Sequence, residues 1–226
     1  MDALTNFWAA FKRLPSAWLL LVQLFILIIS VFAHTSESYQ TLTWAVGVLA
    51  LLIIAKVIHQ TPVFTVLGVF LVSGACLFSF LMLIGLGPTG IQITAHSFEA
   101  AAYFCAAYGL VRYMFSAGYL TKDALFAAAA VFTLIAWGFA FLYNICQLIQ
   151  PHSFQNPNHV ADYQRWLDLL FLSFSLQSAT GLSDVTPIKA AVRVLAMLQM
   201  FAGVMYLALI VSRLIALHYI ERKPDS

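Results

Sequence analysis

Charged residues are scarce in this chain: Asp, Glu, Lys and Arg make up 9% of its 226 residues, whereas hydrophobic residues make up 62%. Soluble domains average about 25% charged and about 45–50% apolar residues. The composition therefore predicts an integral membrane protein with a lipid bilayer as its surroundings. A net charge of +2 provides no basic stripe of the kind that binds nucleic acid.

Reactive side chains are also scarce. The three cysteines all lie in apolar runs, which predicts small buried hydrophobes rather than disulfides or metal ligands. No His/Glu metal motif and no Ser/His/Asp set appears in the apolar runs, so we expect neither an enzyme nor a cofactor.

Long apolar runs dominate what is present. A bilayer-spanning helix needs about 20 residues. Six stretches meet that length, at residues 16–33, 41–59, 63–86, 97–116, 123–148 and 188–218, and a shorter apolar helix lies at 165–178. The pattern predicts an all-α membrane protein of six spans with a re-entrant helix between the fifth and the sixth. We expect a four-helix, sensor-like domain at 1–120, a pore domain at 121–220 and a short tail at 221–226.

The placement of Lys and Arg predicts the orientation. With the N-terminus inside, eight of these residues fall on the cytoplasmic side and three outside. We therefore expect both termini in the cytoplasm and the loop after the short helix to open outward. The first apolar run is long enough to span and is not followed by a small-residue cleavage site, so we do not expect a signal peptide.

The segment from Ser178 to Asp184, followed by Val-Thr-Pro187, is the most informative stretch. Irregular backbone is tolerated at membrane depth only where it lines water or is buried in protein, and pore filters are built from such loops. The alternative is an ordinary outer loop in which Ser183 or Asp184 caps the following helix and Pro187 lies in its first turn.

The region from Phe126 to Leu217 resembles the pore module of tetrameric potassium-channel-like proteins, small six-span bacterial members in particular. In that family a pore helix leads into a filter of the form Thr-Thr-Val-Gly-Tyr-Gly-Asp. The matching run here is Phe174-Ser175-Leu176-Gln177-Ser178-Ala179-Thr180-Gly181-Leu182-Ser183-Asp184, and Gly203, Tyr206-Leu207-Ala208, Val211 and Arg213-Leu214 have the spacing of the family's inner helix.

The resemblance implies a homotetrameric channel in a bacterial inner membrane. It places Phe174, Gln177 and Ser178 on the pore helix, and it implies a filter formed by Ala179, Thr180, Gly181, Leu182, Ser183 and Asp184. The filter carbonyls would bind a permeant monovalent cation, K⁺ or Na⁺, and Asp184 would ring the outer mouth. Gly203 would be either a gating hinge or a site of close helix packing.

Four residues depart from the family's filter. Ala179 replaces the inner Thr, Thr180 replaces Val, Leu182 replaces Tyr and Ser183 replaces the second Gly. A left-handed conformation at Ser183 would cost about 1–2 kcal/mol per chain. We therefore expect a potassium or weakly selective monovalent cation channel.

The fourth span lacks the arginine array of a voltage sensor, since Arg112 is its one arginine and lies near the inner end. We expect gating that is weakly voltage-dependent or voltage-independent. Glu99, with His96 one turn before it, could sense pH, bind a cation, pair with His96 or lie at the membrane interface.

A competing function is a transporter or membrane scaffold whose half-helix forms a substrate site at the midplane. Transporters built from inverted repeats usually show a second broken helix, and the first half of this sequence has none.

Overall fold

The structure, a computed structural model, describes residues 15–32, 62–116, 122–157 and 161–221, and they are almost entirely helical. In these ranges the structure has six helices and two short strands, in the order α2 (Pro15–Phe32), α4 (Pro62–Leu83), α5 (Thr89–Ser116), α6 (Lys122–Ile149), β1 (Phe154–Gln155), α7 (Trp166–Gln177), β2 (Thr186–Pro187) and α8 (Ala190–Glu221).

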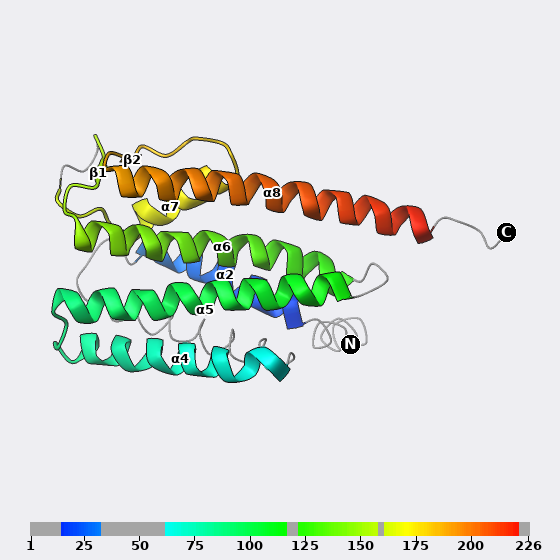
Figure 1. Cartoon of the computed structure of the whole chain (residues 1–226), viewed down its shortest axis with the longest axis horizontal. Coiled ribbons are helices and arrows are strands. Elements are labelled where there is room, and N and C mark those ends of the chain that lie inside the picture. The colour runs from blue at the N-terminus through cyan, green and yellow to red at the C-terminus, as the bar shows by residue number, and fades with distance from the viewer. Residues whose placement is uncertain (1–14, 33–61, 117–121, 158–160, 222–226) are drawn as a thin grey trace.

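The long helices α4, α5, α6 and α8 run along the long axis of the molecule, and α7 lies beside them at one end (Figure 1). That end also carries β1, β2 and the turn between α4 and α5, and we call it the filter end. α8 extends past the other helices at the opposite end. The chain leaves the inner end of α7 and returns to the filter end at β2 (Figure 1).

Most predicted spans correspond to an observed helix. The stretches 16–33, 63–86, 97–116, 123–148 and 188–218 become α2, α4, α5, α6 and α8, and the short stretch 165–178 becomes α7. The fourth begins earlier than expected, at Thr89, where the Pro88 carbonyl accepts from the N–H groups of Ile91 and Gln92 at 2.8 and 3.2 Å. The expected second span, 41–59, lies outside the described residues.

Within the described ranges, two helices are long and apolar enough to cross a membrane. In α6 the segment Asp123–Ile149 has a mean hydropathy of 2.2, and in α8 the segment Ala190–Arg213 has 2.3. Shorter apolar segments occur in α2, α4 and α7. The six-span arrangement remains a prediction.

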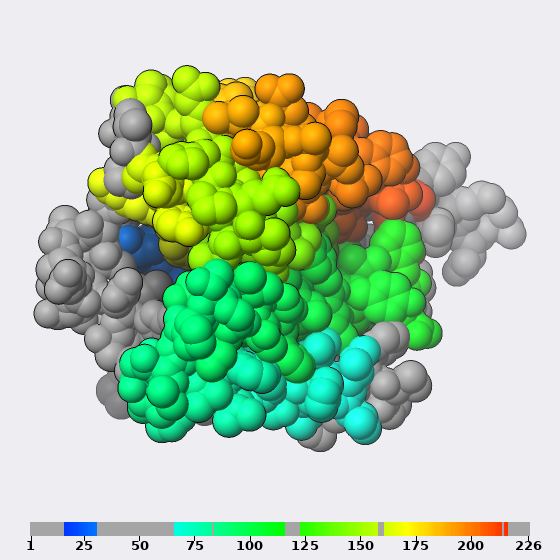
Figure 2. Space-filling view, turned by 60° about the vertical axis from the view of Figure 1, so that its left-hand side comes forward, coloured from blue at the N-terminus to red at the C-terminus, as the bar shows by residue number. Residues whose placement is uncertain are grey.

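α6 lies at the centre of the fold, in contact with α2, α5, α7 and α8. Its alanines Ala127, Ala130, Ala136 and Ala140 are fully buried. Small residues allow helices to approach closely where no side chain intervenes. Seen toward the filter end, α8 lies on one side of the molecule and α4 on the other, with α5 between them (Figure 2).

A buried carboxylate joins α2 to α6 near the start of both helices. The backbone N–H of Ser16 donates to Asp123 Oδ1 at 3.1 Å, and the Ser16 hydroxyl donates to Oδ2 at 3.0 Å. An N-terminal N–H of α2 thus finds an acceptor, and the charge of Asp123 faces the positive ends of two helix dipoles. The first expected span is therefore packed directly on the outer helix of the expected pore domain.

Candidate filter and pore helix

Side chains of α6 hold the start of α7. Gln147 donates from Nε2 to the carbonyl of Gln164 at 3.0 Å and accepts from the Gln164 N–H at 2.8 Å. The Trp166 ring packs on Phe141 with its centroid at 4.5 Å. The N-cap residue Arg165 makes no side-chain capping bond. The short helix therefore depends on α6 for its position.

α7 ends in a Schellman motif. Ser178 is the C-cap, the N–H of Ala179 donates to the Leu176 carbonyl at 3.2 Å, and the N–H of Thr180 donates to the Ser175 carbonyl at 3.1 Å. Ala179 occupies the left-handed position that this motif requires, with φ of 58°. Glycine is the usual residue there, because a Cβ atom is strained in that conformation.

The backbone N–H groups of the loop point back toward α7. Besides Ala179 and Thr180, the N–H of Gly181 donates to the Ser175 carbonyl at 3.3 Å, and the N–H of Ser183 donates to the Ser175 hydroxyl at 3.1 Å. The Thr180 hydroxyl lies on this side too, 3.1 Å from the Ser178 hydroxyl.

A trans peptide sets each N–H antiparallel to the carbonyl of the preceding residue. The carbonyls of Ser178, Ala179, Thr180 and Leu182 therefore point away from α7. Among the described residues, these carbonyls accept no hydrogen bond. The loop presents a row of oxygen atoms on the face opposite the pore helix.

Ser183 does not adopt the left-handed conformation that would be costly for a serine. The left-handed residues of the loop are Ala179 and Gly181, the latter with φ of 65°. Ser183 forms a local turn instead, in which its hydroxyl accepts from the Val185 N–H at 3.1 Å. The backbone strain falls at Ala179, two residues after the end of α7.

The segment after the loop is fixed by strand pairing. β1 and β2 are antiparallel, with Phe154 opposite Pro187, and the Ser153 carbonyl accepts from the Ile188 N–H at 2.9 Å. α8 begins only at Ala190. The alternative in which Ser183 or Asp184 caps that helix is therefore wrong, because both residues precede β2.

The predicted filter residues lie together in one exposed segment. Ala179, Thr180, Gly181, Leu182 and Asp184 are exposed in the single chain, and Ser183 is half-buried. Leu182, in the position of the family's tyrosine, is 70% exposed and turned outward.

The predicted pore-helix residues lie behind the loop. The Phe174 carbonyl accepts from the N–H and the hydroxyl of Ser178, at 2.9 and 2.7 Å. Gln177 is fully buried and donates from Nε2 to the Phe132 carbonyl at 2.7 Å.

Gly203 lies against the last turn of α7. A Cβ atom on it would overlap the carbonyl oxygen of Gln177 and would come within 2.9 Å of the Gln177 Cα. α8 continues as an α-helix through this residue. The absence of a side chain at Gly203 therefore permits close helix packing, and its role as a gating hinge stays a prediction.

Sequence reasoning missed a set of buried polar residues around the pore helix. Tyr143, Ser173 and Gln199 are fully buried and hydrogen-bonded to one another. Gln199, in the middle of the apolar run 188–218, was the available signal. A polar side chain in a membrane span usually has a hydrogen-bond partner on a neighbouring helix.

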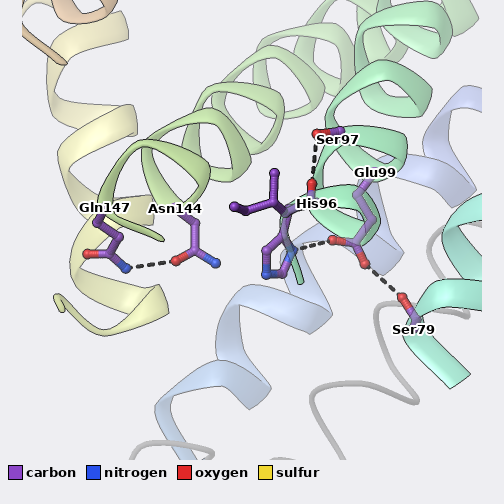
Figure 3. A network of polar contacts seen from close by, with 7 residues as sticks. Ser79, His96, Ser97, Glu99, Asn144 and Gln147 are labelled. Carbon is purple, nitrogen blue, oxygen red and sulfur yellow. Dashed lines mark hydrogen bonds and ion pairs between the residues drawn. The ribbon is translucent and has the colours of Figure 1, made fainter. Parts of the chain in front are cut away.

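Glu99 pairs with His96 at the filter end of α5 (Figure 3). His96 Nδ1 lies 2.8 Å from Glu99 Oε2, and the Ser79 hydroxyl donates to Oε1 at 3.1 Å. Both side chains of the pair are 12% exposed. Of the alternatives considered for Glu99, the structure shows the pairing with His96. Within the described ranges, no group of three or more His, Cys, Asp or Glu residues could hold a metal ion.

α6, α7 and α8 follow one another as a long apolar helix, a half-length helix that ends in a turned loop, and a second long apolar helix. Residues 129–218, from within α6 to near the end of α8, match the family model described as "Ion channel". The match spans about two fifths of the chain and includes α7 and the whole 178–184 loop. Comparisons with curated proteins and with solved structures give no match.

This match supports the prediction of a membrane protein and of a passive ion channel.

Proposed function

We propose that the protein is a passive cation channel that conducts through a fourfold filter at 179–184, with potassium as the first candidate ion. The observation that supports this most directly is the direction of the loop carbonyls. The N–H groups of Ala179, Thr180, Gly181 and Ser183 donate to α7, so the carbonyls that precede them face outward and accept no hydrogen bond from the described residues.

A cation leaving water needs oxygen atoms to replace its hydration shell. One loop supplies a single column of carbonyls, whereas four chains around an axis supply rings of them. Asp184, at the outer end of the column, would raise the local concentration of cations. We therefore propose a homotetramer, in a bacterial inner membrane, with both termini cytoplasmic.

The filter is proposed to select weakly among monovalent cations. Leu182 cannot donate the hydrogen bond that a tyrosine at this position could make behind the filter. Ser183 does not adopt the left-handed conformation that the second glycine of the family's filter allows. The upper part of the filter is thus less constrained than in a strict potassium pore.

Gating is proposed to respond weakly to voltage or not at all. Arg112 is the one arginine of α5 and lies near its far end, so little charge would cross the field when this helix moves. Gly203 remains the candidate hinge of α8.

The reversal potential of the purified protein in planar bilayers tests the proposal. Under opposed K⁺, Na⁺ and Cl⁻ gradients, we expect the reversal potential to follow the monovalent cations and the conductance to vary little with voltage. A reversal that follows chloride would contradict a cation filter, and saturable, current-free uptake of a solute would favour a transporter.

Restoring the family's residues tests the location of the filter. We expect Leu182→Tyr combined with Ser183→Gly to raise the K⁺/Na⁺ permeability ratio by about tenfold or more, since each 1.4 kcal/mol changes a ratio tenfold. Leu86→Tyr, at an exposed leucine in the α4–α5 turn, is the control and should leave the ratio unchanged. If the double variant and Leu86→Tyr have the same K⁺/Na⁺ permeability ratio, the filter lies elsewhere.

A further inference from the structure

A buried polar cluster lies directly behind the loop and includes side chains from three helices. We call it the Gln199 cluster: Tyr143 of α6, Ser173 and Gln177 of α7, and Gln199 of α8, all 0% exposed. Such a cluster is unusual in a chain with so few polar residues, and it lies where α8 crosses α7.

Gln199 is bonded at both ends of its amide. Its Oε1 accepts from the Tyr143 hydroxyl at 2.6 Å. Its Nε2 lies 2.6 Å from the Ser173 hydroxyl, 3.0 Å from the Ser173 carbonyl and 3.3 Å from Gln177 Oε1. α8 is thus hydrogen-bonded to α7 through one side chain and, through that same side chain, to α6.

The rest of the cluster is also satisfied. The Ser173 hydroxyl donates to the Ala136 carbonyl at 2.6 Å, and Gln177 Nε2 donates to the Phe132 carbonyl at 2.7 Å. A buried polar group without a partner costs several kcal/mol away from water. The cluster therefore favours a single relative position of the three helices.

Gly203 gives α8 a second contact with the end of α7. It lies one turn after Gln199 on the same face of the helix, against the backbone of Gln177. Gln177 is the last residue of α7, and Ser175, two residues earlier, accepts from three N–H groups of the loop. A shift of α8 at these two contacts would move the acceptors on which the loop rests.

We propose that Gln199 is a positioning residue for ion selectivity: through Ser173 and Gln177 it sets where α7 holds the carbonyls of 178–182. This inference rests on the proposed channel function. Gln199 does not touch the permeant ion, because it is buried behind the loop. Its effect passes through the last turn of α7 and the N–H groups bonded to Ser175.

The test substitutes Gln199→Met, which keeps the length of the side chain and removes its polar contacts. We expect the K⁺/Na⁺ permeability ratio to change by about threefold or more, the scale of losing one net hydrogen bond. Tyr143→Phe should shift the ratio in the same direction by a smaller factor. In the Gln199→Met background, Tyr143→Phe should add little, because the two groups share one bond.

Tyr206→Phe is the matched control. The Tyr206 hydroxyl donates to the Ala128 carbonyl at 2.6 Å, so it too joins α8 to α6 through a tyrosine hydroxyl, but it does not bond to α7. We expect no change in the permeability ratio for this variant. Equal shifts in Gln199→Met and Tyr206→Phe would overturn the inference, because they would report a general loosening of α8.

Amide hydrogen exchange, read by mass spectrometry, tests the same contact without measuring current. Exchange at residues 175–183 should be faster in Gln199→Met than in Tyr206→Phe. Equal exchange rates in the two variants would overturn the positioning role of Gln199, whether or not the wild-type protein carries current. If the wild-type protein is silent in bilayers, the channel function fails and the exchange result still decides the role of Gln199. If Gln199→Met does not fold, Tyr143→Phe is compared with Tyr206→Phe by the same two measurements.

Discussion

Ala179 shows how single residues shape this loop. It occupies the left-handed position of a Schellman motif, where glycine is usual, and the two N–H groups that close the motif bond to Ser175 and Leu176. The sequence showed that a Thr of the family's filter is absent here. It did not show that the alanine carries the backbone strain, because that depends on where α7 ends.

Ala179→Gly should stabilise the protein by about 1 kcal/mol, since it removes the Cβ strain of a left-handed residue. The midpoint of thermal unfolding in detergent measures this and should rise.

Ala129→Gly, at an exposed position inside α6, is the matched control for that measurement. It should lower the midpoint, because glycine in a helix interior costs about 1 kcal/mol relative to alanine. A decrease of the same size in Ala179→Gly would contradict the assignment of strain.

At the scale of elements, α7 is held between α6 and α8. α7 is only 12 residues long, and Gln147 and Trp166 secure its start, whereas Gln199 and Gly203 contact its end. The apolar pattern of 165–178 predicted the existence and nearly the bounds of this helix. The partners that hold it lie at least 17 residues away along the chain, and local pattern cannot identify them.

Gly203→Ala should destabilise the α7–α8 contact, because the new methyl group overlaps the backbone of Gln177. Overpacking of this kind costs about 1–3 kcal/mol. The yield of folded protein in size-exclusion chromatography should fall.

Gly90→Ala is the control, since a Cβ atom at Gly90 has no neighbour within 4 Å. It should leave the yield unchanged. A Gly203→Ala variant with full yield and altered opening would instead favour the gating hinge.

For the whole molecule, the uncovered surface of α8 is the dominant feature. Only 17% of the apolar segment of α8 is buried, against 56% of the apolar segment of α6. The exposed residues of α8 include Val194, Met197, Leu198, Phe201 and Val204. A helix apolar all round that is mostly uncovered in one chain needs lipid or other chains around it. A fourfold assembly would cover part of this surface and bring the loops to a common axis.

The protein in mild detergent should therefore be a tetramer of 25.0 kDa chains, about 100 kDa, by native mass spectrometry. Phe201→Ala should shift the distribution toward smaller species, because Phe201 is 68% exposed on α8. Phe70→Ala, at a phenylalanine 61% exposed on α4, is the control and should keep the tetramer. A monomer in every mild detergent would contradict the fourfold filter.

The sequence by itself predicted a membrane protein, and it determined the helical architecture and the position of the loop, because these follow from long apolar runs interrupted by short polar segments. It could not determine which loop residue is left-handed, where the carbonyls point or what holds α7. Tertiary structure decided these, since they depend on hydrogen bonds and close contacts between α6, α7 and α8. The strain therefore lies at Ala179, and the alternative cap of α8 by Ser183 or Asp184 is wrong, because the end of α7 and the β1–β2 pairing set the path of the chain.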